Sequence, residues 1–381
     1  MRIRSIHIRG LRAHSDSRYQ FVPGVNLLHG PNGIGKTNVL EAVHYLCLAK
    51  SFLAGTDRHA LRKGEERFQL EAEVTTDRRG DQQIRLIFVP GEGKRLLVNG
   101  VPLERLTDLV GQFPVVVLAP SDHKLTEEGP DERRRFRDTM LCQASPAYLG
   151  ALVAYRRVLK QRNQLLARGR GMRQEMMASY NEAFARHGSR VMLRRARFVQ
   201  EFSGHLETAY NLMAETSERP SISYRTFLAV QRDEEEPALA ERFVAQLEAR
   251  FQDECDRGMT ILGPHRDDLP FQLGPLPVRR YASQGQHRTF VMALKLAQYF
   301  YLNERLGERP IMLLDDVFDT LDPHRMKTIS DLLAGESVGQ SLVSAARRDL
   351  FDSVVTFSEP ASRSIAIQPG REPDIATIKP P

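Results

Sequence analysis

Eight consecutive residues near the start of the chain have the types and spacing that hold a phosphate group. Gly30 to Thr37, read GPNGIGKT, fit the pattern G-x-x-x-x-G-K-[ST] in full. Glycines let the backbone curl so that successive N–H groups can point at phosphate oxygens. Lys36 would reach the β- and γ-phosphates of a nucleotide, and the Thr37 hydroxyl would bind Mg²⁺. The nucleotide ligands expected here are Gly30, Pro31, Asn32, Gly33, Ile34, Gly35, Lys36 and Thr37.

Two carboxylates far along the chain could complete this site. Asp315 and Asp316 follow the apolar run Ile311–Leu314, which indicates a buried parallel strand ending in an acid. Asp315 would hold the metal through water or through Thr37, and Asp316 would polarise a water for attack on the γ-phosphate. Lys36 and Asp316 are therefore the expected catalytic residues, and ATP and Mg²⁺ are the expected cofactors. Such an acid pair is common by chance, so this prediction depends on the phosphate loop.

The elements around the glycines are those that a phosphate loop requires. Val25–Leu28 reads as an apolar strand, and Lys36–Leu48 carries one apolar stripe at helical spacing. Further strands are predicted at Phe68–Thr76, Ile84–Val89, Leu96–Val98, Val115–Leu118 and Ser341–Ser344. Helices are predicted from Pro130, over Leu149–Ala167 and Met176–Tyr210 with a turn at Gly169–Gly171 between them, and over Thr289–Leu302.

Length and composition exclude several classes of protein. A chain of 381 residues suggests two or three structural units. No apolar run approaches the roughly 20 residues of a membrane span, and the charged N-terminus does not resemble a secretion signal. Three distant cysteines without ligand spacing argue against a disulfide scaffold and against a structural zinc site. We expect a cytoplasmic protein without a membrane partner.

One segment is strongly basic. Residues 131–200 contain 16 Lys and Arg against 5 Asp and Glu. Arginines on several helices would contact phosphates without reading bases, which predicts sequence-independent, salt-dependent binding to duplex DNA. A solvated or ion-paired helical face, or a junction between lobes at Arg133–Arg137, is the alternative. The candidate DNA contacts are Arg133, Arg134, Arg135, Arg156, Arg157, Lys160, Arg194 and Arg195.

The order of these elements predicts an α/β fold. Alternating strands and helices at both ends would form one nucleotide-type domain, and the basic helical segment would be a second lobe inserted between them. The predicted boundaries are 1–118 for the first part of that domain, 119–258 for the helical lobe and 259–381 for the remainder.

A further motif precedes a predicted helix. The stretch from Ser283 to Gln286, read SQGQ, would form an anion site at a helix N-terminus, unless it is an ordinary helix cap. It resembles the S-x-G-Q signature of ABC-type ATPases, which contacts the γ-phosphate bound by the other subunit. Phe318–Asp322 resembles the D-loop of that superfamily.

Five motifs together resemble the RecF family of bacterial DNA replication and repair proteins, which is related to the Rad50 and SMC ATPase heads. They are GPNGIGKTN, PDERRRFRD, GPHRDDL, ASQGQHR and LLDDVFDTLD. The resemblance implies an ABC-type P-loop ATPase lobe with a helical second lobe and an ATP-dependent homodimer. It also implies weak, DNA-stimulated ATP hydrolysis and binding to duplex DNA at gap junctions. Together with its partners RecO and RecR, this protein would help load RecA at single-strand gaps, and it would be associated with the SOS response.

The resemblance also assigns residues. Asn38 would join the ATP ligands, and Ser283 and Gln286 would act on the nucleotide of a second copy. The dimer interface would contain Ser283, Gly285, Asp319 and Asp322.

One segment lacks a residue that transporter ATPases have, and the position of another segment has two interpretations. The strand at Ser341–Ser344 lacks the switch histidine of transporters, and Ser344 is the candidate in its place. Arg12 and His14 are expected in an exposed loop, although the corresponding loop of Rad50-like heads approaches the nucleotide.

Three other functions remain open from the sequence. The first is an SMC/Rad50-like head that works with a separate arm protein. The second is a transporter nucleotide-binding subunit, which the long basic insertion disfavours. The third is a P-loop kinase or nuclease, for which no carboxylate cluster beyond Asp315 and Asp316 is visible.

Overall fold

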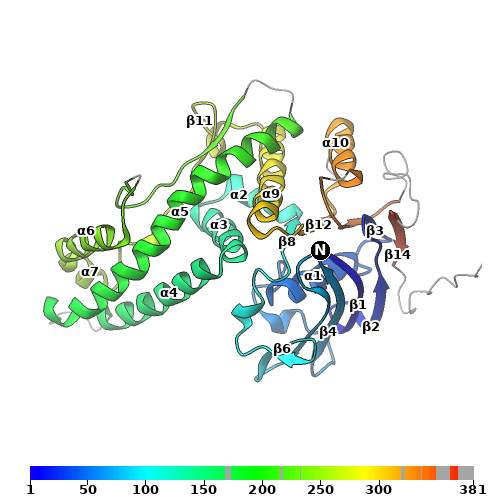
Figure 1. Cartoon of the computed structure of the whole chain (residues 1–381), viewed down its shortest axis with the longest axis horizontal. Helices are drawn as coiled ribbons and strands as arrows, with labels where there is room; N and C mark the ends of the chain where they lie inside the picture. Colours follow the sequence, from blue (N-terminus) through cyan, green and yellow to red (C-terminus); the bar gives the residue numbers. More distant parts are fainter. Residues whose placement is uncertain are drawn as a thin grey trace, which may run out of the picture. The chain divides into compact units, whose positions relative to one another are not determined.

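The chain folds into two compact units, drawn in Figure 1. The computed structural model describes residues 1–167, 173–214, 218–231, 233–318, 322–335, 337–348 and 361–367. Unit 1 comprises Met1–Asp122 and Gln298–Pro381, and unit 2 comprises His123–Ala297. The helix α9 (Gln284–Leu306) continues across this division.

The second boundary differs from the predicted one. Residues 259–297 were expected in the ATPase lobe but pack within unit 2. The reason is a small sheet of order β11-β10-β9, in which β10 (Phe271–Leu273) pairs with β9 (Pro220–Ile222) and with β11 (Leu276–Pro277). This pairing ties the segment before α9 to the helical unit.

Unit 1 contains an antiparallel sheet of order β2-β1-β4-β5-β6-β7. Its strands are β1 (Arg2–Leu11), β2 (His14–Gln20), β4 (Phe68–Thr76), β5 (Gly80–Val89), β6 (Gly93–Val98) and β7 (Val101–Pro102). In β4, buried residues alternate with more exposed ones, because one face of the sheet packs on the core and the other faces solvent.

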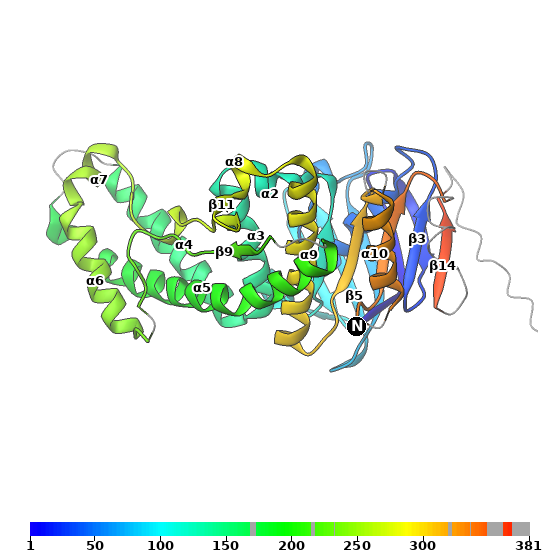
Figure 2. The ribbon, with the colours of Figure 1, turned by 90° about the horizontal axis from the view of Figure 1, so that it is seen from above.

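The second sheet of unit 1 is parallel and has the order β14-β3-β13-β12-β8. Its strands are β3 (Val25–His29), β8 (Val115–Leu118), β12 (Ile311–Asp315), β13 (Ser341–Ala345) and β14 (Ser362–Ala366). Residues of β12 and β13 are buried throughout, as expected for a sheet covered on both faces. Figure 2 shows β3 beside β14, so an N-terminal strand is flanked by two strands from the far end of the sequence.

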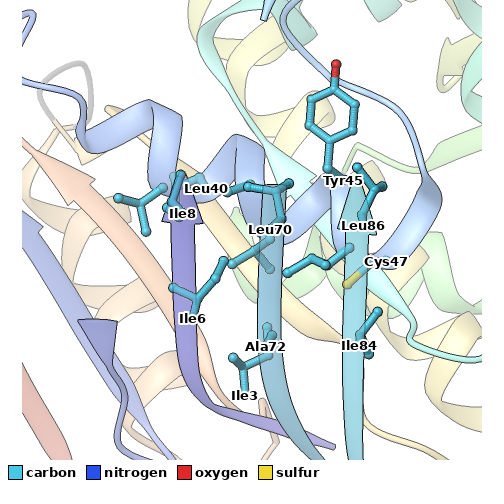
Figure 3. Close-up of a cluster of buried hydrophobic side chains, with 14 of the residues drawn as sticks. Ile3, Ile6, Ile8, Leu40, Tyr45, Cys47, Leu70, Ala72, Ile84 and Leu86 are labelled. Atoms are coloured by element: carbon cyan, nitrogen blue, oxygen red, sulfur yellow. The ribbon is translucent and has the colours of Figure 1, made fainter. Parts of the chain in front are cut away.

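Helix α1 (Lys36–Leu48) lies between the two sheets and contacts strands of both. The helix is buried on almost every side. Besides the predicted apolar stripe of Val39, Leu40, Val43 and Leu46, residues on its other faces are therefore buried as well. Figure 3 shows Leu40, Tyr45 and Cys47 of this helix among side chains of β1, β4 and β5. The first turn of α1 is therefore fixed by a rigid core.

Unit 2 is mainly helical, and α4 and α5 run side by side (Figure 1). Its helices are α2 (Lys124–Glu127), α3 (Pro130–Ala144), α4 (Pro146–Leu166), α5 (Ala178–Met213), α6 (Glu236–Ala249), α7 (Phe251–Arg257), α8 (Val278–Tyr281) and the first part of α9. Helix α10 (Pro323–Ala334) belongs to unit 1. Short 3-10 helices are Asp57–His59, Leu106–Leu109, Pro120–His123, Gln174–Met177 and Pro264–Arg266. Among the described residues, no helix has the length and apolar character needed to cross a membrane. The predicted turn at 169–171 lies outside the described residues.

Candidate nucleotide-binding site

The predicted phosphate loop connects β3 to α1, as its chemistry requires. Gly30, Gly33 and Gly35 have φ values of 148°, 80° and 113°, a region that favours glycine. A Cβ at Gly35 would lie 2.9 Å from His14 Nε2, so a larger residue would also collide there. The loop therefore delivers the N-terminus of a 13-residue helix, with its positive end, to a site for anions.

Lys36 lies across the loop. Its Nζ donates hydrogen bonds to the carbonyl oxygens of Gly30 (2.8 Å) and Pro31 (3.1 Å), and lies 3.4 Å from Asn32 Oδ1. The residue is only 3% exposed. The ammonium is thus held against the loop, where it can compensate the charge of a bound phosphate.

Thr37 and Asp315 meet although 278 positions separate them in the sequence. Thr37 Oγ1 donates to Asp315 Oδ1 at 2.7 Å, and Ser344 Oγ donates to the same oxygen at 2.8 Å. The sheet order explains the meeting, because β13 pairs with both β12 and β3 and brings Ser344 level with Asp315 and Leu28.

The pKa of Asp315 is raised above its ordinary value. Burial is the main cause, and the neighbouring Asp316 adds to it, whereas hydrogen bonds from Thr37 and Ser344 oppose it. A hydroxyl beside a carboxylate suits Mg²⁺, which takes few protein ligands and completes its shell with phosphate oxygens and water. Among the described residues, no group of three or more His, Cys, Asp or Glu forms a separate metal cluster.

Asp316 is held by Ser344. Its backbone has φ 45°, in the left-handed region, and its N–H donates to Ser344 Oγ at 2.9 Å. The same hydroxyl lies 3.3 Å from Asp316 Oδ1. Ser344 therefore connects both acids of the pair.

The loop expected to be exposed is in fact packed against the phosphate loop, so that expectation was wrong for His14. His14 is 4% exposed, and its Nε2 lies 3.1 Å from the carbonyl oxygen of Gly35. Burial lowers the pKa of His14. Arg12 binds Glu41 through two hydrogen bonds of 3.0 and 3.1 Å. A buried glutamate on an apolar helix needs a cation, and Glu41 on α1 was the sequence signal for this pair.

Ser283 and Gln286 form a reciprocal cap at the start of α9. Ser283 N–H donates to Gln286 Oε1 (2.7 Å), and Gln286 N–H donates to Ser283 Oγ (3.2 Å). Gln286 Nε2 also donates to Glu218 Oε1 at 2.7 Å. Ser283 is exposed and Gly285 half-buried. Within one copy, this stretch therefore has the geometry of a helix cap.

Of the two aspartates expected at a dimer interface, the structure describes Asp322. Asp322 caps α10, where its carboxylate accepts from the N–H of Arg325 at 3.0 Å and pairs with the Arg325 side chain. Asp319 lies outside the described residues.

Two of the eight candidate DNA contacts are buried, which corrects the prediction for Arg133 and Arg195. Arg195 is 1% exposed and pairs with Asp138 (2.9 Å) and Asp267 (2.8 Å). Arg133 is 6% exposed and makes two hydrogen bonds to Asp268, at 2.8 and 3.1 Å. Both side chains lie on inward faces of their helices with aspartate counter-ions, so they do not present a charge to DNA.

The six other candidates remain nearer the surface. Arg134 donates to the carbonyl oxygen of Asp267 at 2.7 Å, and Arg135 pairs with Glu132 at 2.6 Å while 69% of its side chain is exposed. Arg194 is half-buried. On α4, the exposed cations are Arg156, Arg157 and Lys160. Arg156 and Lys160 also line an open groove of about 450 Å³.

Comparisons with known sequences point to one family. The family described as RecF/RecN/SMC N-terminal domain matches residues 2–363. The chain is 47% identical to the DNA replication and repair protein RecF of Salinibacter ruber, over 97% of this chain and 91% of that protein. It is 42% identical to the RecF of Chloroherpeton thalassium, over 93% of this chain and 97% of that protein.

Comparisons with solved structures point to the same family. The structure of the recombination mediator protein RecF with ATP in the RecFOR pathway matches with a TM-score of 0.88 and 28% identity, covering 97% of this chain and 96% of that one. A Pyrococcus furiosus structure of the Smc head domain with the C-terminal domain of ScpA matches with a TM-score of 0.53 and 14% identity, over 97% of this chain and 94% of that one. This second match concerns the fold alone. Together they confirm the predicted α/β fold class.

Proposed function

Because the chain belongs to the RecF family of DNA replication and repair proteins, as its motifs predicted, we propose that it is an ATP-gated DNA-binding protein. Two copies would close on two ATP molecules and hold duplex DNA near single-strand gaps. Slow, DNA-stimulated hydrolysis would reopen them. The observation that carries the proposal is the meeting of Thr37, Asp315 and Ser344 beside the phosphate loop.

Within one copy, each part of the site has a distinct task in ATP binding and hydrolysis. The backbone N–H groups from Asn32 to Thr37 and the Lys36 ammonium bind phosphate oxygens, and Asn38 extends this set along α1. Thr37 and Asp315 would hold Mg²⁺, which neutralises phosphate charge when bound. Asp316 accepts a proton from the attacking water, and Ser344 keeps that carboxylate in place.

The dimer part of the proposal concerns residues outside this pocket. Ser283 and Gln286 would complete the nucleotide site of the second copy, with Gly285 allowing close approach. Asp319 and Asp322 would lie at the same interface. The support is the exposed α9 cap, whose helix N-terminus favours an anion.

The DNA part rests on the cations of unit 2 that remain near the surface. We include Arg134, Arg135, Arg156, Arg157, Lys160 and Arg194, and exclude Arg133 and Arg195. Contacts from these residues would reach phosphates and not base edges. One structural neighbour is described as acting in the RecFOR pathway, and we propose that this chain also works with RecO and RecR to help load RecA at gaps.

The decisive experiment measures duplex DNA affinity with ATP, with ADP and without nucleotide, at several salt concentrations. We expect tight binding with ATP only and a steep loss of affinity with salt, because displaced counterions drive phosphate contacts. Equal DNA affinity in all three nucleotide states would contradict the proposal that ATP controls DNA binding.

The same titration tests the surface of α4. Replacing Arg157 and Lys160 with glutamine should weaken binding and reduce the slope of log affinity against log salt by about 0.9 for each lost phosphate contact. The control replaces Arg58 and Arg95 of unit 1, which are also exposed, with glutamine. An unchanged slope in the α4 variant, or the same change in the control, would remove α4 from the DNA site.

A further inference from the structure

Unit 2 contains a cavity of about 940 Å³ that contains none of the proposed nucleotide ligands. One wall comes from α5, and the others come from the chain after β9, from β10 and α8, and from single residues of α2 and α3. Its volume is in the range of sites that enclose a ligand or several side chains of a partner.

The lining carries an excess of positive charge. Four arginines line the cavity against one acid, Asp268. That carboxylate is shared by Arg133, which binds it through two hydrogen bonds, and by Arg225, whose Nη2 lies 2.7 Å from it. The other two arginines, Arg279 and Arg280, are exposed. No second carboxylate lines the cavity among the described residues, so its charge is suited to an acidic ligand.

The Arg279 guanidinium keeps donors available for such a ligand. Its Nε donates to the carbonyl oxygen of Glu127 at 3.1 Å, which leaves its two terminal nitrogens for another acceptor. Arg280 follows directly on the same short helix. Guanidinium groups bind carboxylates through two parallel hydrogen bonds, a geometry that lysine does not offer.

The rest of the lining combines an aliphatic wall with the uncharged polar residues Thr126, Gln200, Ser223, Thr226 and Gln272, and its apolar part argues against nucleic acid. The apolar wall consists of Ala196, Val199, Ala229, Val230, Pro270 and Pro277. The two aromatic residues of the lining are already engaged: Tyr224 donates its hydroxyl to Asp267, and Phe271 is 5% exposed and packs on Phe290 with ring centroids 5.3 Å apart. Single-stranded nucleic acid needs aromatic faces on which bases stack, and a duplex backbone has no aliphatic group to bury here.

We propose that this cavity is the docking site for an acidic segment of a partner protein, in which carboxylates stand beside aliphatic side chains. The carboxylates bind Arg279 and Arg280, and the aliphatic groups pack on Val199 and Val230. The binding energy comes from burying those groups while the charge pairs fix the register. The inference is independent of ATP hydrolysis and of DNA binding.

The test selects phage-displayed random peptides on the full chain in the presence of excess duplex DNA, which occupies DNA-binding surfaces. We expect the selected peptides to combine Asp or Glu with Leu, Ile or Val. Synthetic versions should lose about tenfold or more in affinity when Arg279 and Arg280 are both replaced with glutamate, because two attractive pairs become repulsive. Fluorescence anisotropy of the labelled peptide measures this loss.

A matched control replaces Arg186 and Arg257, two exposed arginines of unit 2 outside the cavity, with glutamate. It should keep peptide affinity. A second variant, Val199→Ser, removes aliphatic surface from the wall without adding a charge and should also weaken binding. ATP affinity, which reports on unit 1, and the melting temperature show that each variant is folded.

Three outcomes would overturn the inference. The first is selected peptides without acidic residues, and the second is equal binding to the Arg279→Glu, Arg280→Glu variant and to the control. The third is competition by a single-stranded or duplex oligonucleotide that the same variant abolishes, which would assign the cavity to nucleic acid.

Discussion

At the scale of single residues, one hydroxyl organises the acid pair of the nucleotide site. Ser344 donates to Asp315, accepts from the N–H of Asp316 and lies beside the Asp316 carboxylate. A left-handed backbone costs a non-glycine residue roughly 1 kcal/mol, and the hydrogen bond to Ser344 offsets a similar amount at Asp316. We therefore propose that Ser344 positions the acid pair for hydrolysis, whereas its place as a substitute for a switch histidine stays a prediction.

We expect Ser344→Ala to lower kcat for ATP hydrolysis roughly tenfold while ATP affinity changes little. The reason is that the lost hydrogen bonds hold the acid proposed to activate water, whereas the proposed phosphate ligands are the loop and Lys36. Phosphate release gives kcat, and a fluorescent ATP analogue gives affinity. Ser344→Thr keeps the hydroxyl and should restore the rate. A parallel loss of affinity and rate in Ser344→Ala would show that the serine only supports the local structure.

At the scale of elements, an ion network holds the helices of unit 2 to the GPHRDDL segment. Asp138 of α3 binds Arg195 of α5 and accepts from the Tyr148 hydroxyl at 2.7 Å. Burial alone would raise the pKa of Asp138, but Arg195, Arg137 and Tyr148 outweigh it and lower the pKa to about 2. The GPHRDDL segment thus supplies Asp267 and Asp268 as counter-ions for arginines of α5 and α3.

We expect Asp138→Asn to destabilise unit 2 by about 3–5 kcal/mol at neutral pH, because it removes the carboxylate paired with buried Arg137 and leaves buried Arg195 with Asp267 alone. Glu132→Gln on the same helix, in a pair with the exposed Arg135, should cost under about 1 kcal/mol. Urea unfolding measures both. Equal effects of the two changes would mean that the buried pairs contribute no more than surface ones.

The lowered pKa of Asp138 also predicts an acid transition. A carboxylate whose folded pKa is depressed contributes stability above its unfolded pKa of about 3.9 and loses it as pH falls towards the folded value of about 2. Wild-type stability should therefore decline over this window, and Asp138→Asn should show a smaller decline there. Thermal unfolding at a series of pH values measures it. An equally steep decline in the variant would assign the transition to other groups.

Some features of this structure can be predicted from the sequence, and others cannot. The helix Lys36–Leu48 and the strand Phe68–Thr76 match the structure, because local periodicity and a glycine start set their limits. The position of Asp315 beside Thr37 was also predictable, since a phosphate loop needs an acid at the end of another parallel strand of its sheet. The burial of Arg133 and Arg195 was not, because net charge does not reveal which face of a helix points inward. The inward orientation of Arg133 and Arg195 depends on counter-ions that are distant in the sequence, Asp268 and Asp267.

At the scale of the whole molecule, the proposed switch depends on two copies. The phosphate loop and the acid pair lie in unit 1, whereas the cap at Ser283 lies in unit 2. If the phosphate loop of one copy and the Ser283 cap of the other both bind the γ-phosphate, these contacts would strengthen the association of the two copies. ATP would then stabilise the dimer by mass action, and ADP would not.

We expect Asp316→Asn to accumulate as a dimer with ATP, since binding persists while hydrolysis stops. Light scattering coupled to size-exclusion chromatography, at several protein concentrations, measures the mass. Ser283→Arg is the control, because it should bind ATP but remain monomeric. A monomer of Asp316→Asn at saturating ATP would contradict the proposed dimer.

The strand order of the parallel sheet has a consequence for synthesis on the ribosome. β3, which leads into the phosphate loop, pairs only with β13 and β14 in that sheet, and neither exists until residue 341 has been translated. A nascent chain therefore carries an apolar strand with two open edges for most of its elongation, a state prone to misassembly. A message cut short before that point yields a polypeptide that has the glycines but no sheet to support them.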